Sequence, residues 1–560
     1  MANSNPIESS TPVDIYVNSR KAASVIVVRD RSPGEIEILM MRRAERPGDF
    51  RSGAVVFPGG VLDARDREAH AHCLGWDDKA ASQRLGLDQG GLDYWIAAAR
   101  ECFEEVGLLF LDPLGPQAAS QAHADWRAAM QAGEAGIADL CQALGSRIDL
   151  RQWAYFAHWL TPLGRNKRFD TRFFVTLAPA GQEAVADRAE AVELMWVTPA
   201  EALDRAAEYK LLPVTRRNLK DLAQFDSAQS VLDHARSLHD IPLVLPRLAT
   251  SSKGERIVHP SEFSWAEIGR LDPHGHGQAW CEITAGRVVQ LSARVMRITA
   301  PNPGVMTGPG TNTYLVGDPS RSRWTVIDPG PADPQHIQAL MDAAPGAIER
   351  ICVTHTHVDH SPGAVALSKA TGAPVWGRRP AHAQGQDPTF NPQHELQGGE
   401  RIELGPTTHL QVVHTPGHAS NHLCYLLEEE KTLFCGDHVM QGSTVVINPP
   451  DGDMRVYLQS LQALLNVELD WLAPGHGFLV AQPHAVVRAL VAHRLGRESK
   501  VVAGMQELGP ASIEALVSVV YADVPVGLHP VARRSLLAHL LKLQADGRAR
   551  VDEDVWSLTT

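Results

Sequence analysis

The stretch Thr354-His355-Thr356-His357-Val358-Asp359-His360 decides how the second half of this 560-residue chain is interpreted. It follows a short apolar run at 351–353, so the sequence predicts a loop at the end of a buried strand. Three imidazoles and one carboxylate within six residues are difficult to explain as packing. Zinc binds neutral imidazole nitrogen and carboxylate oxygen, and its catalytic sites leave one position open for water. The stretch therefore predicts a metal site.

Three more candidate ligands follow at the ends of later apolar runs. They are His418 in Thr415-Pro416-Gly417-His418, Asp437 in Cys435-Gly436-Asp437-His438, and His476 in Pro474-Gly475-His476-Gly477. Surface histidines or hydrogen-bonded core histidines are the alternative, and a single histidine would favour it. The ordered set instead favours separate loops that converge on one site. Ser443 and Thr444, a few residues after Asp437, are candidates for lining the substrate face.

The ordered set resembles the metallo-β-lactamase superfamily, whose His-x-His-x-Asp-His signature is followed by a later His, Asp and His. The resemblance implies an αβ/βα sandwich with two zinc ions. Its implied ligands are His355, His357 and His418 for one ion, Asp359, His360 and His476 for the other, and Asp437 as the bridge. It also implies that Asp359 is a catalytic residue that orients the attacking water.

The C-terminal residues 491–560 have the pattern of helices followed by a two-stranded ribbon, which looks like a winged helix. A metallo-hydrolase with this tail resembles the β-lactamase-like protein 2 group, known in part as endoribonucleases. The tail holds eight basic and eight acidic residues, so it lacks the positive charge that nucleic-acid binding uses. We interpret it as a packing or dimerisation element, with nucleic-acid binding as the alternative.

The first half carries an acidic cluster on a predicted helix. Residues 92–110 have helical composition and contain Arg100-Glu101-Cys102-Phe103-Glu104-Glu105-Val106-Gly107-Leu108. The three glutamates are spaced i, i+3 and i+4, so they share one helix face and repel one another. A hard cation such as Mg²⁺ would relieve the repulsion, and such ions are held by carboxylates together with substrate phosphates. A solvated acidic helix face is the alternative.

With the upstream turn Pro58-Gly59-Gly60, this helix resembles the Nudix box, and most closely the coenzyme A diphosphatase branch. The resemblance implies an α/β/α sandwich that hydrolyses diphosphates with Mg²⁺ or Mn²⁺. Its implied metal-binding and catalytic residues are Glu101, Glu104 and Glu105, with Arg100 as a further catalytic residue. Its implied substrate-binding residues are Arg43, Gly59, Gly60 and Arg168. Two departures, Asp66 at the position of the first box glutamate and the insertion 67–99, leave a non-catalytic nucleotide sensor as the alternative.

Composition limits the other classes of function. A net charge of −13 argues against a protein built for non-specific nucleic-acid binding. The seven cysteines are scattered without a C-x-x-C pair, which fits a reducing cytoplasm. We find neither a signal peptide nor an apolar run long enough to cross a membrane, and we expect no membrane partner.

The sequence thus predicts a multidomain α/β and α+β hydrolase. The expected parts are a Nudix-like domain at 1–240, a linker at 241–285, a metallo-β-lactamase-fold domain at 286–490 and a winged-helix-like tail at 491–560. For the zinc site the candidate substrates are esters, thioesters such as acyl-CoA, and phosphodiesters, including single-stranded RNA. For the Nudix site they are coenzyme A compounds and other nucleoside diphosphate derivatives.

Overall fold

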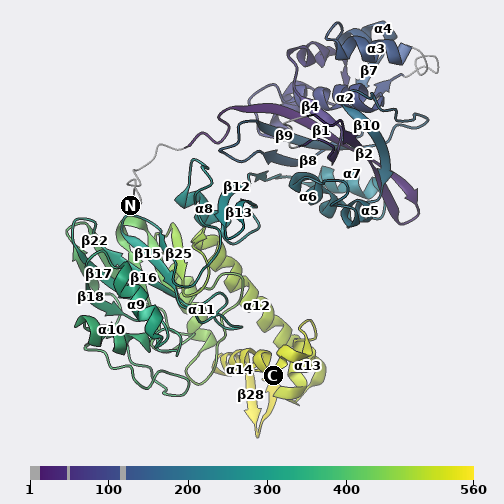
Figure 1. Cartoon of the computed structure of the whole chain (residues 1–560). Coiled ribbons are helices and arrows are strands. Elements are labelled where there is room, and N and C mark those ends of the chain that lie inside the picture. Colours follow the sequence, from purple (N-terminus) through teal and green to yellow (C-terminus); the bar gives the residue numbers. More distant parts are fainter. Residues whose placement is uncertain (1–12, 47–50, 114–121, 560) are drawn as a thin grey trace. The chain divides into compact units, whose positions relative to one another are not determined.

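The computed structural model describes residues 13–46, 51–113 and 122–559 (Figure 1). The chain forms two compact units, Asp14–Pro246 and Arg247–Thr560. Within the described parts, none of the helices combines the length and apolar character that crossing a bilayer requires. All seven cysteines are free thiols and buried.

The first unit is built on a mixed eight-stranded sheet. Its central strand β1 (Ser19–Ser32) pairs antiparallel with β2 (Glu35–Arg43) and parallel with β9 (Arg168–Leu177). The remaining strands are β3 (Val55–Val56), β4 (Gly59–Val61), β8 (Trp153–Leu160), β10 (Ala191–Val197) and β11 (Leu243–Val244). The run 22–28 is apolar without alternation because both faces of the sheet are covered.

Helices cover the two faces of this sheet and make two separate cores (Figure 1). Helix α2 (Leu92–Val106) packs on one face through Trp95 and Phe103. The opposite face is covered by α5 (Pro199–Asp204), α6 (Pro213–Leu222) and α7 (Ala228–Ser237). The arrangement is the α/β/α sandwich that the Nudix resemblance implied.

Small elements extend the α2 side of the sandwich. They are η1 (Ala64–His72), β5 (Cys73–Leu74), α1 (Asp78–Leu85), β6 (Leu111–Asp112), α3 (Ala122–Gln131), α4 (Ile137–Leu144) and β7 (Arg147–Asp149). About half of the sequence insertion 67–99 lies in η1, β5 and α1, and its last residues begin α2. The insertion is therefore folded onto the sandwich and not an extended loop.

The second unit begins with a small subdomain. It contains the hairpin β12 (Arg247–Ser251) and β13 (Gly254–Val258) and the helix α8 (Trp265–Leu271), which share a core around Ala249 and Ile268. This subdomain occupies most of the segment 241–285 that the sequence assigns to a linker.

Two sheets form the body of the second unit. The first contains β14 (Val288–Gln290), β15 (Val295–Thr299), β16 (Asn312–Gly317), β17 (Arg323–Ile327), β18 (Ala347–Cys352), β19 (Val375–Gly377) and β20 (His394–Glu395). The second contains β21 (Arg401–Gly405), β22 (Thr408–His414), β23 (Leu423–Leu427), β24 (Thr432–Gly436), β25 (Trp471–Pro474) and β26 (Val480–Ala481), with η2 (Glu428–Glu430) between β23 and β24. Ile327 of the first sheet and Phe434 of the second belong to one core, so the sheets pack face to face.

Helices cover the outer faces of both sheets. Helices α9 (Pro334–Ala343) and α10 (Gly363–Thr371) pack on the first sheet, and α11 (Met454–Leu464) and the start of α12 (Pro483–Leu508) pack on the second. The result is the predicted αβ/βα sandwich. The predicted metal residues lie in loops at strand ends, where backbone that leaves the sheets is free to present side chains.

The chain ends in a winged helix. Helices α13 (Ile513–Val520) and α14 (His529–Ala545), with the turn η3 (Val526–Leu528), pack on the last part of α12. Strand β29 (Val555–Leu558) pairs with β27 (Ala511–Ser512) and β28 (Ala549–Asp552). The predicted fold class is thus confirmed for the tail as well.

Candidate metal centres

The loop after β18 is folded around Asp328. Its carboxylate accepts hydrogen bonds from the backbone N–H and the hydroxyl of Thr354, both at 2.7 Å, and lies 2.9 Å from Nδ1 of His360. Asp328 is buried and adopts φ +52°, a left-handed conformation that few side chains take up. No sequence argument singled out this residue, because its partners are 26 and 32 positions away.

His355, His357 and His418 bring three ring nitrogens together. Nδ1 of His357 lies 2.9 Å from Nε2 of His355 and 3.0 Å from Nε2 of His418. Burial, reinforced by the charge of the neighbouring imidazole, lowers the pKa of His357 to about 3 and that of His355 well below its usual value. Both rings are thereby kept neutral, which is the form that binds a metal ion.

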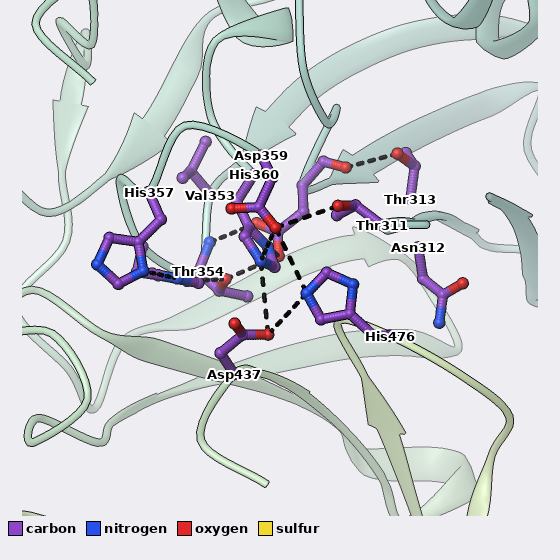
Figure 2. Close-up of polar contacts among 12 residues, drawn as sticks. Thr311, Asn312, Thr313, Val353, Thr354, His357, Asp359, His360, Asp437 and His476 are labelled. Carbon is purple, nitrogen blue, oxygen red and sulfur yellow. Dashed lines mark hydrogen bonds and ion pairs between the residues drawn. The ribbon is translucent and has the colours of Figure 1, made fainter. Parts of the chain in front are cut away.

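Asp359, His360 and His476 form a second set, which Asp437 closes into a ring (Figure 2). Oδ2 of Asp359 lies 3.4 Å from Nε2 of both histidines, and Oδ1 of Asp437 lies 3.5 Å from Nε2 of His360 and 3.3 Å from Nε2 of His476. Ligand atoms placed tetrahedrally around one zinc ion at its usual bond lengths would be separated by about 3.3–3.6 Å. The separations in this ring are therefore compatible with one zinc ion.

Asp437 stands between the two sets. Its Oδ1 faces the second set, and its Oδ2 lies 3.8 Å from Nε2 of His418 in the first. A Cβ on Gly475 would approach Oδ1 of Asp437 and Cε1 of His360 to 2.7 Å. The absence of a side chain at Gly475 therefore allows the two sets to meet at one carboxylate.

Several polar atoms in the second set are buried without a hydrogen bond. Among the described residues, Nε2 of His360, Oδ1 of Asp437 and Nε2 of His476 have no hydrogen-bond partner. Burial opposes charge on His476, but the carboxylates of Asp437 and Asp359 outweigh it and raise its pKa to about 9. Unpaired buried polar atoms are destabilising, and a divalent cation would satisfy all three, so the donor set fits a metal ion.

The other ring nitrogen of three of these histidines has a hydrogen-bond partner that orients the ring. Nδ1 of His418 lies 2.8 Å from the carbonyl of Val446, and Nδ1 of His476 lies 3.1 Å from the carbonyl of Gly310. His360 is oriented by Asp328 in the same way. Metal-binding histidines in general donate their second N–H to such acceptors.

On α2 of the first unit, Arg100 gathers three carboxylates. Its Nε lies 2.7 Å from Oδ1 of Asp66, and its Nη1 lies 3.0 Å from Glu101 and 3.1 Å from Glu104. Asp66 is 1% exposed, so the carboxylate that replaces the first box glutamate is held inside the domain by this ion pair.

Glu105 points the other way, toward the glycine turn. Its Oε2 accepts a hydrogen bond of 2.7 Å from the N–H of Gly59, whereas its Oε1 is buried with no partner among the described residues. Burial, reinforced by the charge of Glu101, raises the pKa of Glu105 well above its usual value. Burial likewise raises the pKa of Glu104 to about 7, although Arg100 opposes the rise.

The structure does not bring all the predicted Nudix residues together. Among the described residues, Glu101, Glu104 and Glu105 do not place three ligand atoms within 4.8 Å of one another. Gly60 lies directly against the Glu101 carboxyl group, where a Cβ would approach to 2.4 Å, and the charge of Arg43 acts on Glu105.

Arg168, which the Nudix resemblance implied as a substrate-binding residue, contacts backbone carbonyls in the structure. The side chain is 3% exposed, and its donors bind the carbonyls of Ile15, Val17, Thr161 and Pro162. These bonds tie the start of β9 to the chain before β1.

Three family models match this chain. Residues 306–476 match the family model of the metallo-beta-lactamase superfamily, residues 89–214 that of the NUDT19 Nudix domain, and residues 512–556 that of the beta-lactamase associated winged helix domain. A beta-lactamase-like protein 2 homolog from Drosophila melanogaster is 33% identical over 282 residues, covering 48% of this chain and 93% of the relative. The chain belongs to the metallo-beta-lactamase superfamily.

Other members are less similar. An atrochrysone carboxyl ACP thioesterase from Aspergillus chevalieri is 29% identical over 274 residues, covering 46% of this chain and 83% of the relative. A solved beta-lactamase domain protein from Burkholderia ambifaria is 19% identical, with a TM-score of 0.43, covering 50% of this chain and 95% of that one. The family matches confirm the fusion expected from the sequence, and the chain is a hydrolase with a Nudix domain, a metallo-β-lactamase domain and a winged helix.

Proposed function

We propose that the metallo-β-lactamase domain is a dinuclear zinc hydrolase of acyl thioesters and that the Nudix domain hydrolyses diphosphates of the coenzyme A type. One observation carries the proposal for the zinc site: two sets of ligand atoms meet at Asp437, whose two oxygens face different sets. Two zinc ions held there would polarise a carbonyl group and supply an activated water near neutral pH.

The residues around Asp359 support a catalytic role for this carboxylate. The hydroxyl of Thr311 donates a hydrogen bond of 3.2 Å to its Oδ2, which fixes the side chain between His360 and His476 (Figure 2). The second oxygen, Oδ1, would accept a proton of the attacking water and orient its lone pair toward the substrate carbonyl. The carboxylate form is available at neutral pH because, against the effect of burial, His360 and His476 hold the pKa of Asp359 well below its usual value.

Two observations favour a thioester over RNA as the substrate. The relative from A. chevalieri is named a thioesterase, and the winged-helix tail of this chain carries equal numbers of acidic and basic residues. The second candidate is cleavage of single-stranded RNA, which the presence of a winged helix favours. A site that activates water attacks carbonyl carbon and phosphorus alike, so substrate choice depends on the surrounding surface.

For the Nudix domain, Glu101, Glu104 and Glu105 would hold Mg²⁺ or Mn²⁺. The unpartnered Oε1 of Glu105 supports this role, and the pKa of about 7 suits Glu104 to accept a proton from water near neutral pH. Such cations would neutralise the diphosphate. The alternative for this domain is that it binds a nucleotide without cleaving it, and the separation of the three carboxylates in the structure favours that alternative.

The seven buried free thiols support a reducing compartment, because disulfides are rare there and cysteines remain unpaired. We therefore propose that the enzyme is cytoplasmic. The proposed partners are small molecules that contain a thioester or a diphosphate, and the winged helix is the proposed dimerisation element.

A substrate panel on the full-length protein tests both assignments. We expect release of free thiol from acyl-CoAs, lost in His355→Ala, and Mg²⁺-dependent cleavage of the coenzyme A diphosphate, lost in Glu104→Gln. Because each substitution removes one activity, each serves as the control for the other. RNA cleavage that depends on His355, with every thioester intact, would establish RNA cleavage as the function of the zinc site. Binding of coenzyme A without cleavage would establish the sensor.

A further inference from the structure

A groove lies between helix α12 and the loop 439–444, which begins two residues after Asp437. Its volume is about 370 Å³. The residues that line it are Val439, Met440, Gly442, Ser443, Thr444, Val486, Leu490 and His493. This size is within the range of small-molecule sites, which are mostly apolar with a few polar groups. Ser443 and Thr444, which the sequence indicates as candidates for the substrate face, are among the lining residues.

Helix α12 supplies one wall. Val486, Leu490 and His493 are spaced i, i+4 and i+7, so they form a single stripe along the helix. An adjacent face, which includes Val487 and Arg494, is buried against the body of the unit. Val486 and Leu490 pack against the hydrophobic core but are partly exposed, so some of their apolar surface is available to a ligand.

The loop that supplies the other wall is joined to the metal residues. It begins two residues after Asp437 and ends two residues before Val446, whose carbonyl lies 2.8 Å from Nδ1 of His418. Between these points, Oε1 of Gln441 accepts a hydrogen bond of 3.0 Å from the N–H of Phe478, close to His476. The wall and the ligand set are therefore parts of one connected structure.

We propose that this groove binds the acyl chain of the thioester substrate, an inference that rests on the thioesterase function proposed above. The carbonyl would lie at the metal residues, and the chain would extend along Val439, Met440, Val486 and Leu490. Ser443, Thr444 and His493 would accommodate a polar substituent on the chain.

The lining favours an aliphatic chain over a nucleotide. Single-stranded nucleic acids are bound by aromatic rings that stack on bases and by Lys or Arg that pair with phosphates. The eight lining residues include no Phe, Tyr or Trp and no Lys or Arg. His493 is the only ring among them, and four of the eight have aliphatic or thioether side chains.

The test compares acetyl-, butyryl-, hexanoyl- and octanoyl-CoA on the zinc-loaded full-length protein. Wild-type kcat/KM should rise about threefold to fourfold per methylene until the groove is full. Leu490→Trp should fill the groove, lower kcat/KM for octanoyl-CoA at least tenfold and leave acetyl-CoA within twofold. Leu495→Trp is the matched control, because Leu495 lies on the same helix, is 43% exposed and is not among the lining residues.

A direct binding measurement separates the groove from the reaction. Calorimetric titration with octanoate should show binding to wild type and to Leu495→Trp, but at least tenfold weaker binding to Leu490→Trp. If no thioester is cleaved yet octanoate binds in this pattern, the thioesterase function fails and the groove stands as an aliphatic site. The proposal that the groove binds the acyl chain would be overturned by either of two results. One is octanoate binding that Leu490→Trp leaves unaffected, and the other is an equal loss of activity in Leu490→Trp on all chain lengths.

Discussion

Glu267 and Arg297 form a bidentate ion pair inside the metallo-β-lactamase unit, with oxygen to nitrogen distances of 2.6 and 2.8 Å. Their side chains are 1% and 2% exposed. Oε2 of Glu267 also accepts a hydrogen bond of 2.7 Å from the N–H of Leu479, three residues after His476. The pair therefore joins α8, β15 and the loop that carries a predicted metal ligand.

Glu267→Gln should destabilise this unit by about 3–5 kcal/mol, because the substitution leaves the Arg297 guanidinium buried without its counter-charge. It should also lower the metal content, since the His476 loop loses an anchor. Differential scanning calorimetry and elemental analysis of the purified protein measure the two effects.

Glu349→Gln is the control for that substitution. Glu349 forms an ion pair of 2.9 Å with Arg323, but the two side chains are 38% and 57% exposed. Exposed pairs contribute about 0–1 kcal/mol, so the melting temperature should hardly change. Equal effects of the two glutamate substitutions would show that the buried pair does not support the site.

The two-set geometry predicts unequal losses of metal. His418→Ala should release mainly one ion, because the ring around Asp359, His360 and His476 stays intact. Asp437→Ala should weaken the binding of both ions, since its two oxygens face different sets. Metal stoichiometry after dialysis against a weak chelator distinguishes these outcomes, and equal losses in the two variants would contradict the assignment of Asp437 as the bridge.

Glu104 predicts a pH dependence of stability in the absence of divalent cations. Its raised pKa of about 7 means that its contribution to stability is fully present below about pH 4.5 and is lost as the pH rises through 7. Glu104→Gln carries no charge at any pH, so at pH 8 it should be more stable than wild type, by at most about 3 kcal/mol.

The difference between Glu104→Gln and wild type should disappear near pH 4.5. Calorimetric scans at pH 4.5 and pH 8 in chelator measure it, and Glu134→Gln, at an exposed position, is the control. Added Mg²⁺ should stabilise wild type at pH 8 and have less effect on Glu104→Gln. A Glu104→Gln variant that melts below wild type at pH 8 would contradict this account.

The sequence predicted what local patterns encode. The order of His, Asp and His residues predicted a set of side chains that the structure brings together, and apolar runs with turn residues located the strands that position them. Asp328 and Glu267 escaped prediction because their roles depend on partners 26 to 212 positions away, which no local pattern reveals. Arg168 was predicted to bind substrate from the Nudix resemblance, and the backbone carbonyls that its side chain contacts in the structure could not be seen in the sequence.

Gly475 offers the sharpest test of how the two sets of ligands meet. Gly475→Ala would place a methyl group 2.7 Å from Oδ1 of Asp437 and from Cε1 of His360, closer than real Cβ contacts allow. The Asp437 carboxylate, which is the predicted bridge, must then shift. We therefore expect a loss of bound metal and a drop of at least tenfold in kcat/KM for acyl thioester hydrolysis. Gly496→Ala is the control, because a Cβ there meets nothing within 4 Å and alanine favours a helix interior by up to about 1 kcal/mol. Full metal content in Gly475→Ala would show that the close approach of Gly475 is not needed for the site.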